Sequence, residues 1–283
     1  MTAALARPLV EAAVARALAE DLGTAGDLTS DALIQADQWG SAVIAARQSG
    51  YLCGTAYAQY AFALMDPRIA VTAQRSDGAE IGSGDAVMRV EGPLRGILGA
   101  ERTALNFLTH LSGVATTTAG YVAAVAGTNA RIACTRKTVP GLRAAQKYAV
   151  RCGGGSNHRF GLHDGILIKD NHIAACGGVA PAIARAKTVS GHMVKICTEA
   201  DTLEQAEAAA VAGSDIVLLD NMAPATLAEA VRVIDGRAMT EASGGVSCES
   251  VRAIAESGID VISIGALTHS APALDLGLDL QAG

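Results

Sequence analysis

Residues 194–220 read VKICTEADTLEQAEAAAVAGSDIVLLD and contain the repeating unit of the chain. A short apolar run at 194–199 is followed by an alanine-rich segment of helical character at 203–212 and a second apolar run at 215–220. Each apolar run ends on an acidic residue. This order of strand, helix and strand is typical of α/β proteins, in which helices cover both faces of a parallel sheet.

The same alternation extends through the C-terminal half of the chain. Strands are expected at 131–136, 165–169, 194–199, 215–220, 238–242 and 260–265. Helices are expected at 180–188, 203–212, 224–234 and 248–257. This pattern predicts either an α/β barrel, which needs one or two further strands, or an open doubly wound sheet.

Polar residues at the ends of the expected strands favour the barrel. These residues are Arg136, Lys137, Lys169, Glu199, Asp220 and Glu241. The three acids follow one another at intervals of 21 residues. Because the carboxyl ends of parallel strands converge on one point in a barrel, these side chains are expected to share a site. No G-x-G-x-x-G motif follows a strand, which disfavours a dinucleotide-binding fold.

The N-terminal part of the chain has a different organisation, with strands and helices in an α+β order. Strands are expected at 41–47, 68–74 and 86–91, and helices over about 1–23, at 56–64 and from Leu94 onward. Gly113 is expected to interrupt or end the last helix. We therefore expect a first domain at 1–110 and a second at 111–267.

Composition excludes several classes of protein. The 283 residues include 22 Lys and Arg against 28 Asp and Glu, a net charge of −6, which disfavours a nucleic-acid binder. No apolar run approaches the length of a membrane span, and the N-terminal segment lacks the apolar core of a signal peptide. The six cysteines include no C-x-x-C pair, so we expect reduced thiols and a cytoplasmic protein.

The segment 131–159 is the most basic part of the chain. Its 29 residues contain seven Lys or Arg and no acid, in a chain of net negative charge. The seven are Arg131, Arg136, Lys137, Arg143, Lys147, Arg151 and Arg159. This segment predicts an anion site, in which arginine supplies forked donors for carboxylate or phosphate. Three of the seven, at 143, 147 and 151, have a helical spacing that is equally typical of a solvated helix face.

Two further features predict the chemistry. Glu199 and Asp220 can share a hard cation such as Mg²⁺, which binds carboxylates together with a phosphate ligand. A glycosidase acid pair is the rival interpretation, disfavoured by the scarcity of aromatic residues. The glycine-containing segments Ser243-Gly244-Gly245 and Gly265-Ala266 follow strands and can offer backbone N–H groups to phosphate. From the residues alone we predict an enzyme with one phosphorylated substrate and one substrate that carries carboxylates.

Several longer motifs resemble those of quinolinate phosphoribosyltransferase. They are ERTALN at 101–106, TRKTVPGLR at 135–143, KYAV at 147–150, GGGSNHR at 153–159, IKDNH at 168–172, LLDN at 218–221, SGG at 243–245 and GALT at 265–268. The resemblance covers about Asp21 to Leu280. It implies an N-terminal α/β sandwich domain, to which the tail 268–283 returns, and an open seven-stranded α/β barrel of the TIM-like kind. It also implies a homodimer, or a higher homo-oligomer, in which Arg102 reaches the partner's site.

The resemblance further implies the reaction and the residues that carry it. Quinolinate and phosphoribosyl pyrophosphate would give nicotinate mononucleotide, pyrophosphate and CO₂. The carboxylates of quinolinate would be held by Arg102, Arg136, His158, Arg159 and Lys169. The catalytic residues would be Lys137, which touches phosphate, and Glu199 and Asp220, which serve the ribose hydroxyls and Mg²⁺. The remaining substrate-binding residues would be Thr135, Ser243, Gly244, Gly245, Gly265 and Ala266.

Two positions depart from the pattern that the resemblance implies. Cys134 and Cys197 stand where the family usually has acids, and strand alternation places each on the same face as a functional neighbour, one layer deeper in the barrel. A paralogue that acts on another pyridine or aromatic acid is therefore one alternative. A barrel that binds a phosphorylated metabolite without turnover is another, disfavoured by the intact acids Glu199 and Asp220. A sugar-phosphate isomerase or aldolase is a third.

Overall fold

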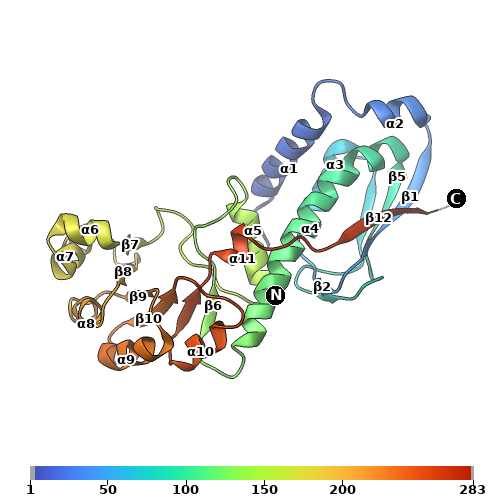
Figure 1. Ribbon diagram of the computed structural model, residues 1–283. Coiled ribbons are helices and arrows are strands. Elements are labelled where there is room, and N and C mark those ends of the chain that lie inside the picture. The colour runs from blue at the N-terminus through green and yellow to red at the C-terminus, as the bar shows by residue number, and fades with distance from the viewer. Residues whose placement is uncertain (1–3, 282–283) are drawn as a thin grey trace. The chain divides into compact units, whose positions relative to one another are not determined.

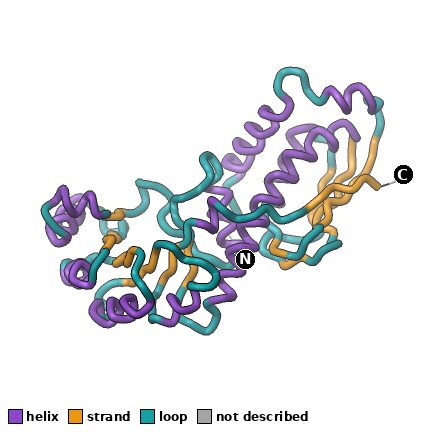
Figure 2. The backbone as a smooth tube through the Cα atoms, viewed as in Figure 1, coloured by secondary structure: helices purple, strands orange, loops and turns teal. Residues whose placement is uncertain are grey.

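The computed structural model describes residues 4–281, which form two compact units (Figures 1 and 2). The first unit contains the described residues up to 119, the segment 138–154 and the residues from 267 onward. The second unit contains 120–137 and 155–266. The boundary expected between residues 110 and 111 falls inside one long helix, α4 (Leu94–Ala124).

The first unit is built on a four-stranded antiparallel sheet in the order β12-β1-β5-β3. Its strands are β1 (Trp39–Ala46), β3 (Ala70–Ala73), β5 (Ala86–Pro93) and β12 (Leu276–Gln281), and a separate pair consists of β2 (Gly50–Tyr51) and β4 (Glu80–Ile81). The C-terminal strand β12 pairs with β1 over six residues, from Ser41 opposite Gln281 to Ala46 opposite Leu276. The C-terminal segment Leu276–Gln281 is therefore part of the N-terminal sheet.

Helices complete the first unit and bury its apolar core. They are α1 (Arg7–Leu22), α2 (Leu28–Leu33), α3 (Thr55–Met65), the main part of α4, and α5 (Arg143–Cys152). The side chain of Asp27 caps α2 by accepting hydrogen bonds from the backbone N–H groups of Thr29 and Ser30. The largest side chains with almost no exposure in this core include Ile44, Leu52, Phe62, Ile97 and Leu108.

The expectation that Gly113 interrupts or ends its helix was wrong, since α4 continues to Ala124. A Cβ atom at this position would lie 2.0 Å from the carbonyl oxygen of Pro272. The C-terminal segment crosses the helix here, and the Leu274 N–H donates a hydrogen bond to the Thr109 carbonyl oxygen at 3.0 Å. Glycine is thus required for close approach of a distant part of the chain, and a helix tolerates it.

The second unit contains a six-stranded parallel sheet in the order β6-β11-β10-β9-β8-β7. Its strands are β6 (Arg131–Ala133), β7 (Ile166–Ile168), β8 (Ile196–Ala200), β9 (Ile216–Asp220), β10 (Met239–Ser243) and β11 (Val261–Ser263). Its helices are α6 (Asp170–Cys176), α7 (Val179–Val189), α8 (Leu203–Val211), α9 (Pro224–Ile234) and α10 (Val251–Glu256). The short α11 (Ala266–His269) follows β11 and, apart from Ala266, belongs to the first unit. All six expected strands and four expected helices are confirmed.

A seventh sheet position is a single parallel bridge between Ala133 and Ser156. Ser156 donates its backbone N–H to the carbonyl of Ile132 and accepts from the N–H of Cys134. With this bridge beside β6, the sheet has the cyclic strand order of an α/β barrel, interrupted between Ser156 and β7. The α/β fold class is confirmed, and the strand missing from the sequence pattern is too short to show a periodicity.

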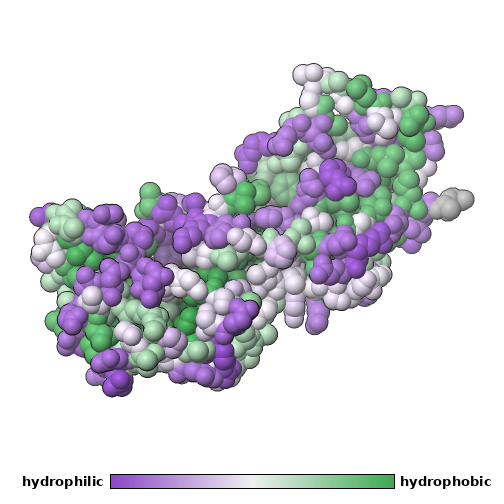
Figure 3. All heavy atoms as spheres, in the orientation of Figure 1, coloured by the Kyte–Doolittle hydropathy of each residue, from purple (hydrophilic) through white to green (hydrophobic). Residues whose placement is uncertain are grey.

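Surface features of residues 4–281 add little to the choice of function. None of their helices is long and apolar enough to cross a membrane. Figure 3 shows one face, on which both hydrophilic and hydrophobic residues are exposed. Such scattered apolar exposure is ordinary for a folded chain.

Candidate active site

A cavity of about 470 Å³ lies at the carboxyl ends of the strands in the second unit. Eleven of the fourteen residues predicted to bind substrate line it. These eleven are Thr135, Arg136, Lys137, His158, Arg159, Lys169, Glu199, Asp220, Ser243, Gly244 and Gly245. Of the other three, Gly265 and Ala266 follow β11 without lining the cavity, and Arg102 is an exposed residue of α4 in the first unit.

One wall of the cavity is cationic. Arg159 donates from Nη1 to the Gly165 carbonyl oxygen at 2.9 Å. Its Nε is buried and has no hydrogen-bond partner within residues 4–281. Burial lowers the pKa of Arg159, and the positive charge of Arg136 lowers it further. The positive charges of Arg136 and Arg159 repel one another, and Nε of Arg159 is a buried donor without a partner in the described residues. A bound anion would relieve both effects, so this wall is a candidate anion site.

His158 is held in one tautomer beside this wall. Its Nδ1 accepts a hydrogen bond from the backbone N–H of Arg159 at 2.7 Å. The neutral ring must then carry its proton on Nε2, which lies 3.6 Å from Oε1 of Glu241. His158 therefore presents a donor toward the cavity that it lines.

Glu241 is a site residue to which sequence reasoning assigned no role, although the 21-residue spacing includes it. Only 3% of the residue is exposed, and its Oε1 has no hydrogen-bond partner within the described chain. Burial raises the pKa of Glu241 to about 6, partly offset by a hydrogen bond from Ser263. The least exposed acid that lines the cavity is therefore half-protonated near pH 6.

This raised pKa predicts the pH dependence of stability in Glu241→Gln. The folded state favours the protonated carboxyl. The contribution of Glu241 to the free energy of unfolding of the wild type is therefore fully present below pH 4.5 and is lost as pH rises through 6. A shift of this size corresponds to about 2 kcal/mol. Relative to wild type, the variant should gain about 2 kcal/mol in free energy of unfolding between pH 4.5 and 7.5, measured with urea. Glu229→Gln, on the exposed face of α9, is the control, and a pH-independent difference for Glu241→Gln would contradict the prediction.

Acidic side chains also line the cavity, among them Glu199 and Asp220. One carboxylate oxygen from each of Glu199, Asp201 and Asp220 lies within 4.8 Å of the other two. Nζ of Lys169 lies 2.7 Å from Oε2 of Glu199. Oxygen donors from three carboxylates fit a hard divalent cation such as Mg²⁺. Asp201 was not predicted from the sequence as a site residue. The signal was its position two residues after Glu199, because side chains two residues apart in an extended chain lie on the same side.

Asp220 is held in place by its neighbours. Asn221 donates from Nδ2 to Oδ2 of Asp220 at 2.7 Å and from its backbone N–H to the Ser243 carbonyl at 2.8 Å. Gly244 has a φ of +94°, and a Cβ atom there would lie 2.1 Å from Oδ1 of Asn221. The glycine after β10 thus makes room for the side chain that orients an acid at the end of β9.

The two cysteines that depart from the family pattern are both buried. The Cys134 thiol donates to Oδ1 of Asn157 at 3.2 Å. Sγ of Cys197, a ring nitrogen of His158 and a carboxylate oxygen of Glu241 all lie within 4.8 Å of one another. Burial raises the pKa of Cys197 well above its usual range, so this thiol adds no negative charge beneath the cationic wall.

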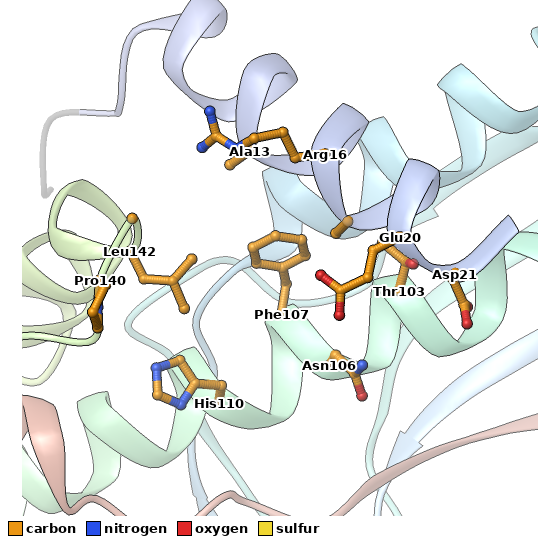
Figure 4. A pocket seen from close by; sticks show the side chains of 12 residues that line it. Ala13, Arg16, Glu20, Asp21, Thr103, Asn106, Phe107, His110, Pro140 and Leu142 are labelled. Carbon is orange, nitrogen blue, oxygen red and sulfur yellow. The ribbon is translucent and has the colours of Figure 1, made fainter. Parts of the chain in front are cut away.

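A second cavity, of about 530 Å³, lies in the first unit and contains none of the predicted site residues. Figure 4 shows its lining side chains, which come from α1, α4 and the segment at 140–142. Glu20 and Asp21 lie at one side and Phe107 near the middle. This hollow lacks the converging cations of the first cavity.

Comparison with known proteins agrees with the geometry. The family model "Quinolinate phosphoribosyl transferase, C-terminal domain" matches residues 114–279, and the corresponding N-terminal domain matches 27–112. A probable nicotinate-nucleotide pyrophosphorylase [carboxylating] of Bacillus subtilis is 42% identical over 92% of this chain and 90% of its own length. The nicotinate-nucleotide pyrophosphorylase [carboxylating] of Mycobacterium leprae is 43% identical, over 94% and 95%.

A solved structure gives the same result. NadC from Streptococcus pyogenes is 39% identical, superimposes with a TM-score of 0.94, and the match covers 99% of this chain and 100% of that one. Both domains of the family model are thus present in order, with the cavity at the strand ends of the second. The chain belongs to the quinolinate phosphoribosyltransferase family.

Proposed function

We propose that this enzyme transfers the phosphoribosyl group of phosphoribosyl pyrophosphate to quinolinate with loss of CO₂, a step of NAD biosynthesis. The products are nicotinate mononucleotide and pyrophosphate. One observation carries the proposal: a single cavity combines a cationic wall, in which the buried Nε of Arg159 has no hydrogen-bond partner among residues 4–281, with Glu199 and Asp220, whose carboxylates form a cluster with the neighbouring Asp201. Such a cavity suits a dicarboxylate and a metal-bound diphosphate side by side.

The cationic wall would bind quinolinate. The guanidinium groups of Arg136 and Arg159 offer forked donors to its two carboxylates, and His158 adds Nε2–H. Lys169 would join them when its ion pair with Glu199 opens toward substrate. The raised pKa of Glu241 means that this acid takes up a proton more readily than an exposed glutamate, which would lower its repulsion of a bound carboxylate.

The acidic cluster would hold Mg²⁺ and the ribose. Glu199, Asp201 and Asp220 supply the oxygen atoms, and a bound Mg²⁺ would neutralise charge on the leaving pyrophosphate. Lys137 is exposed at the cavity and can reach phosphate. Backbone N–H groups of 243–245, with Gly265 and Ala266, would hold the 5′-phosphate.

The chemistry then follows from positioning and charge. The ring nitrogen of quinolinate attacks the anomeric carbon as the bond to pyrophosphate breaks, and the ring becomes a pyridinium. The cationic ring nitrogen stabilises the electron pair that stays on the adjacent ring carbon when its carboxylate leaves as CO₂, and this carbon then takes up a proton to give nicotinate mononucleotide. Fixed cations and acids around both substrates would lower the barrier without a covalent enzyme intermediate.

Product analysis tests this function. Purified protein receives phosphoribosyl pyrophosphate and Mg²⁺ with either quinolinate or nicotinate, and nicotinate mononucleotide and CO₂ are measured. We expect turnover with quinolinate alone and its loss on addition of a chelator. Saturable binding of phosphoribosyl pyrophosphate without product from quinolinate would instead favour a paralogue that acts on another aromatic acid, or a sensor without turnover.

We also propose a homodimer in which Arg102 completes the partner's site. Arg102 is exposed on α4, so its guanidinium is accessible to a second copy of the chain. A cytoplasmic location is proposed as well, because all six cysteines are free thiols. Analytical ultracentrifugation and cell fractionation test the two proposals.

Complementation tests the role of Arg102 directly. Arg102→Ala and Lys137→Ala should each be inactive as homodimers. In a refolded equal mixture, half of the dimers are mixed and each holds one intact site, so about one quarter of wild-type activity should return. Mixing each variant with itself is the control. No recovery in a mixture shown to contain mixed dimers would place Arg102 outside the partner's site.

A further inference from the structure

Two cysteines separated by 99 positions in sequence meet in the first unit, and neither lines the active-site cavity. Cys53 follows β2, and Cys152 is the last residue of α5. Their Sγ atoms and a carboxylate oxygen of Asp77 all lie within 4.8 Å of one another. Both cysteines are buried, Cys53 completely and Cys152 with 8% of its surface exposed.

Asp77 joins the two segments that carry these cysteines. Its Oδ1 accepts a hydrogen bond from the backbone N–H of Thr55 at 3.0 Å, and its Oδ2 accepts from the Tyr148 hydroxyl at 2.9 Å. Thr55 stands two residues after Cys53, and Tyr148 stands one helical turn before Cys152. One carboxylate therefore holds both cysteine-bearing segments together.

Helix α4 also contacts both segments, the one at Cys53 and the one that follows Cys152. Ser112 accepts from the Cys53 N–H at 2.9 Å and donates to the Cys53 carbonyl oxygen at 3.2 Å. A Cβ atom on Gly153 would lie 2.3 Å from the Ala115 carbonyl oxygen, so the chain after Cys152 packs directly on the helix backbone. Ser112 and Ala115 are three residues apart and share one face of α4. Backbone contacts thus keep the two thiols close together.

The two thiols differ in acidity. Burial raises the pKa of Cys53, whereas a hydrogen bond from the Cys53 thiol lowers the pKa of Cys152. Tyr148 and the positive charge of Arg151 lower it further, against the opposing effects of burial and of Asp77. The pair therefore contains one thiol suited to ionise and one suited to stay protonated, which is the division of roles between an attacking and a resolving cysteine.

We propose that Cys53 and Cys152 form a redox-active pair that a hydroperoxide converts into a reversible disulfide. The Cys152 thiolate attacks a peroxide oxygen, the O–O bond breaks, and the departing hydroxide takes a proton to become water. The Cys53 thiol then attacks the sulfenic sulfur of Cys152 and a second water leaves. Two thiols are oxidised and one hydrogen peroxide is reduced to two waters; a dithiol reductant reverses the change.

The disulfide would tie the inserted segment 138–154 covalently to the N-terminal part of the first unit. This segment begins directly after Arg136 and Lys137 and ends shortly before His158 and Arg159, so its ends continue into the cationic wall. A cross-link that closes so long a loop is expected to raise the melting temperature by about 5 °C.

Titration of the purified full chain with hydrogen peroxide, followed by peptide mapping, tests the proposal. We expect one cross-linked pair of peptides, containing Cys53 and Cys152, a mass loss of about 2 Da, a higher melting temperature and full reversal by dithiothreitol. Cys53→Ser should leave Cys152 as a sulfenic acid that dimedone traps. Cys176→Ser and Cys248→Ser are matched controls and should oxidise as wild type does.

Oxidation of wild-type protein at the exposed Cys248 while Cys152 stays unmodified would overturn the proposal. So would a disulfide that joins either cysteine to a different partner. Because this mapping is done on wild-type protein, it gives an answer even if Cys53→Ser fails to fold.

Discussion

Arg159→Ala should lower kcat/KM for quinolinate by about 100- to 1000-fold. The guanidinium lies in the cavity wall; Nη1 is held by the Gly165 carbonyl oxygen, whereas the buried Nε has no hydrogen-bond partner within the described residues and is left to donate to substrate. Truncating one partner of a buried, hydrogen-bonded charge pair costs roughly 2–5 kcal/mol, and each 1.4 kcal/mol is a factor of ten. Steady-state kinetics with quinolinate varied at saturating phosphoribosyl pyrophosphate measures the effect.

Two further variants distinguish the loss of quinolinate binding from a general loss of folded structure. Arg159→Lys keeps the charge but loses the planar fork, so it should recover only part of the lost activity. Arg185→Ala, on the exposed face of α7, should keep wild-type kinetics. Calorimetry should show phosphoribosyl pyrophosphate binding to Arg159→Ala within about 3-fold of wild type, since the loss belongs to one substrate. An equal loss for both substrates would mean that Arg159 supports the cavity as a whole.

The strand ends were predictable from sequence because their signal is local. An apolar run that ends on a charged residue and is followed by a helix identifies Glu199 and Asp220 without knowledge of the fold. The sequence alone therefore predicts these two acids and the cations of 136–159 as site residues. Their convergence on one cavity follows from a general property of parallel strands, whose carboxyl ends meet at one edge.

The features that escaped prediction depend on distant contacts. Gly113 has the sequence appearance of a helix end, and only the crossing of residue 272 explains why it lies within α4. The seventh sheet position is a single bridge at Ser156, which is too short to show the alternation of apolar and polar residues by which a strand is predicted. Glu241 has the spacing of a site acid, but its altered pKa arises from burial, which the spacing does not reveal. The meeting of Cys53 and Cys152 likewise results from tertiary packing alone.

Asp220→Asn should reduce kcat by about 1000-fold and raise the Mg²⁺ concentration needed for half-maximal activity. The substitution keeps the size of the side chain, and Asn221 can still hydrogen-bond to its amide oxygen, so the fold should persist. It removes one of three carboxylates whose oxygens lie within 4.8 Å of one another. Loss of a metal-binding charge opposite a leaving pyrophosphate costs several kcal/mol of transition-state stabilisation. Rates over a Mg²⁺ titration measure both effects.

Asp201→Asn is the matched comparison, because it removes a charge from the same cluster. Asp201 is exposed, whereas Asp220 is half-buried and held by Asn221, so solvent should screen Asp201 more and its loss should cost less than that of Asp220. Calorimetric titration with Mn²⁺ gives a readout independent of turnover, and affinity should fall in the order wild type, Asp201→Asn, Asp220→Asn. If Mn²⁺ affinity is the same in all three while kcat falls only in Asp220→Asn, the acid acts on the ribose hydroxyls and the cation binds elsewhere.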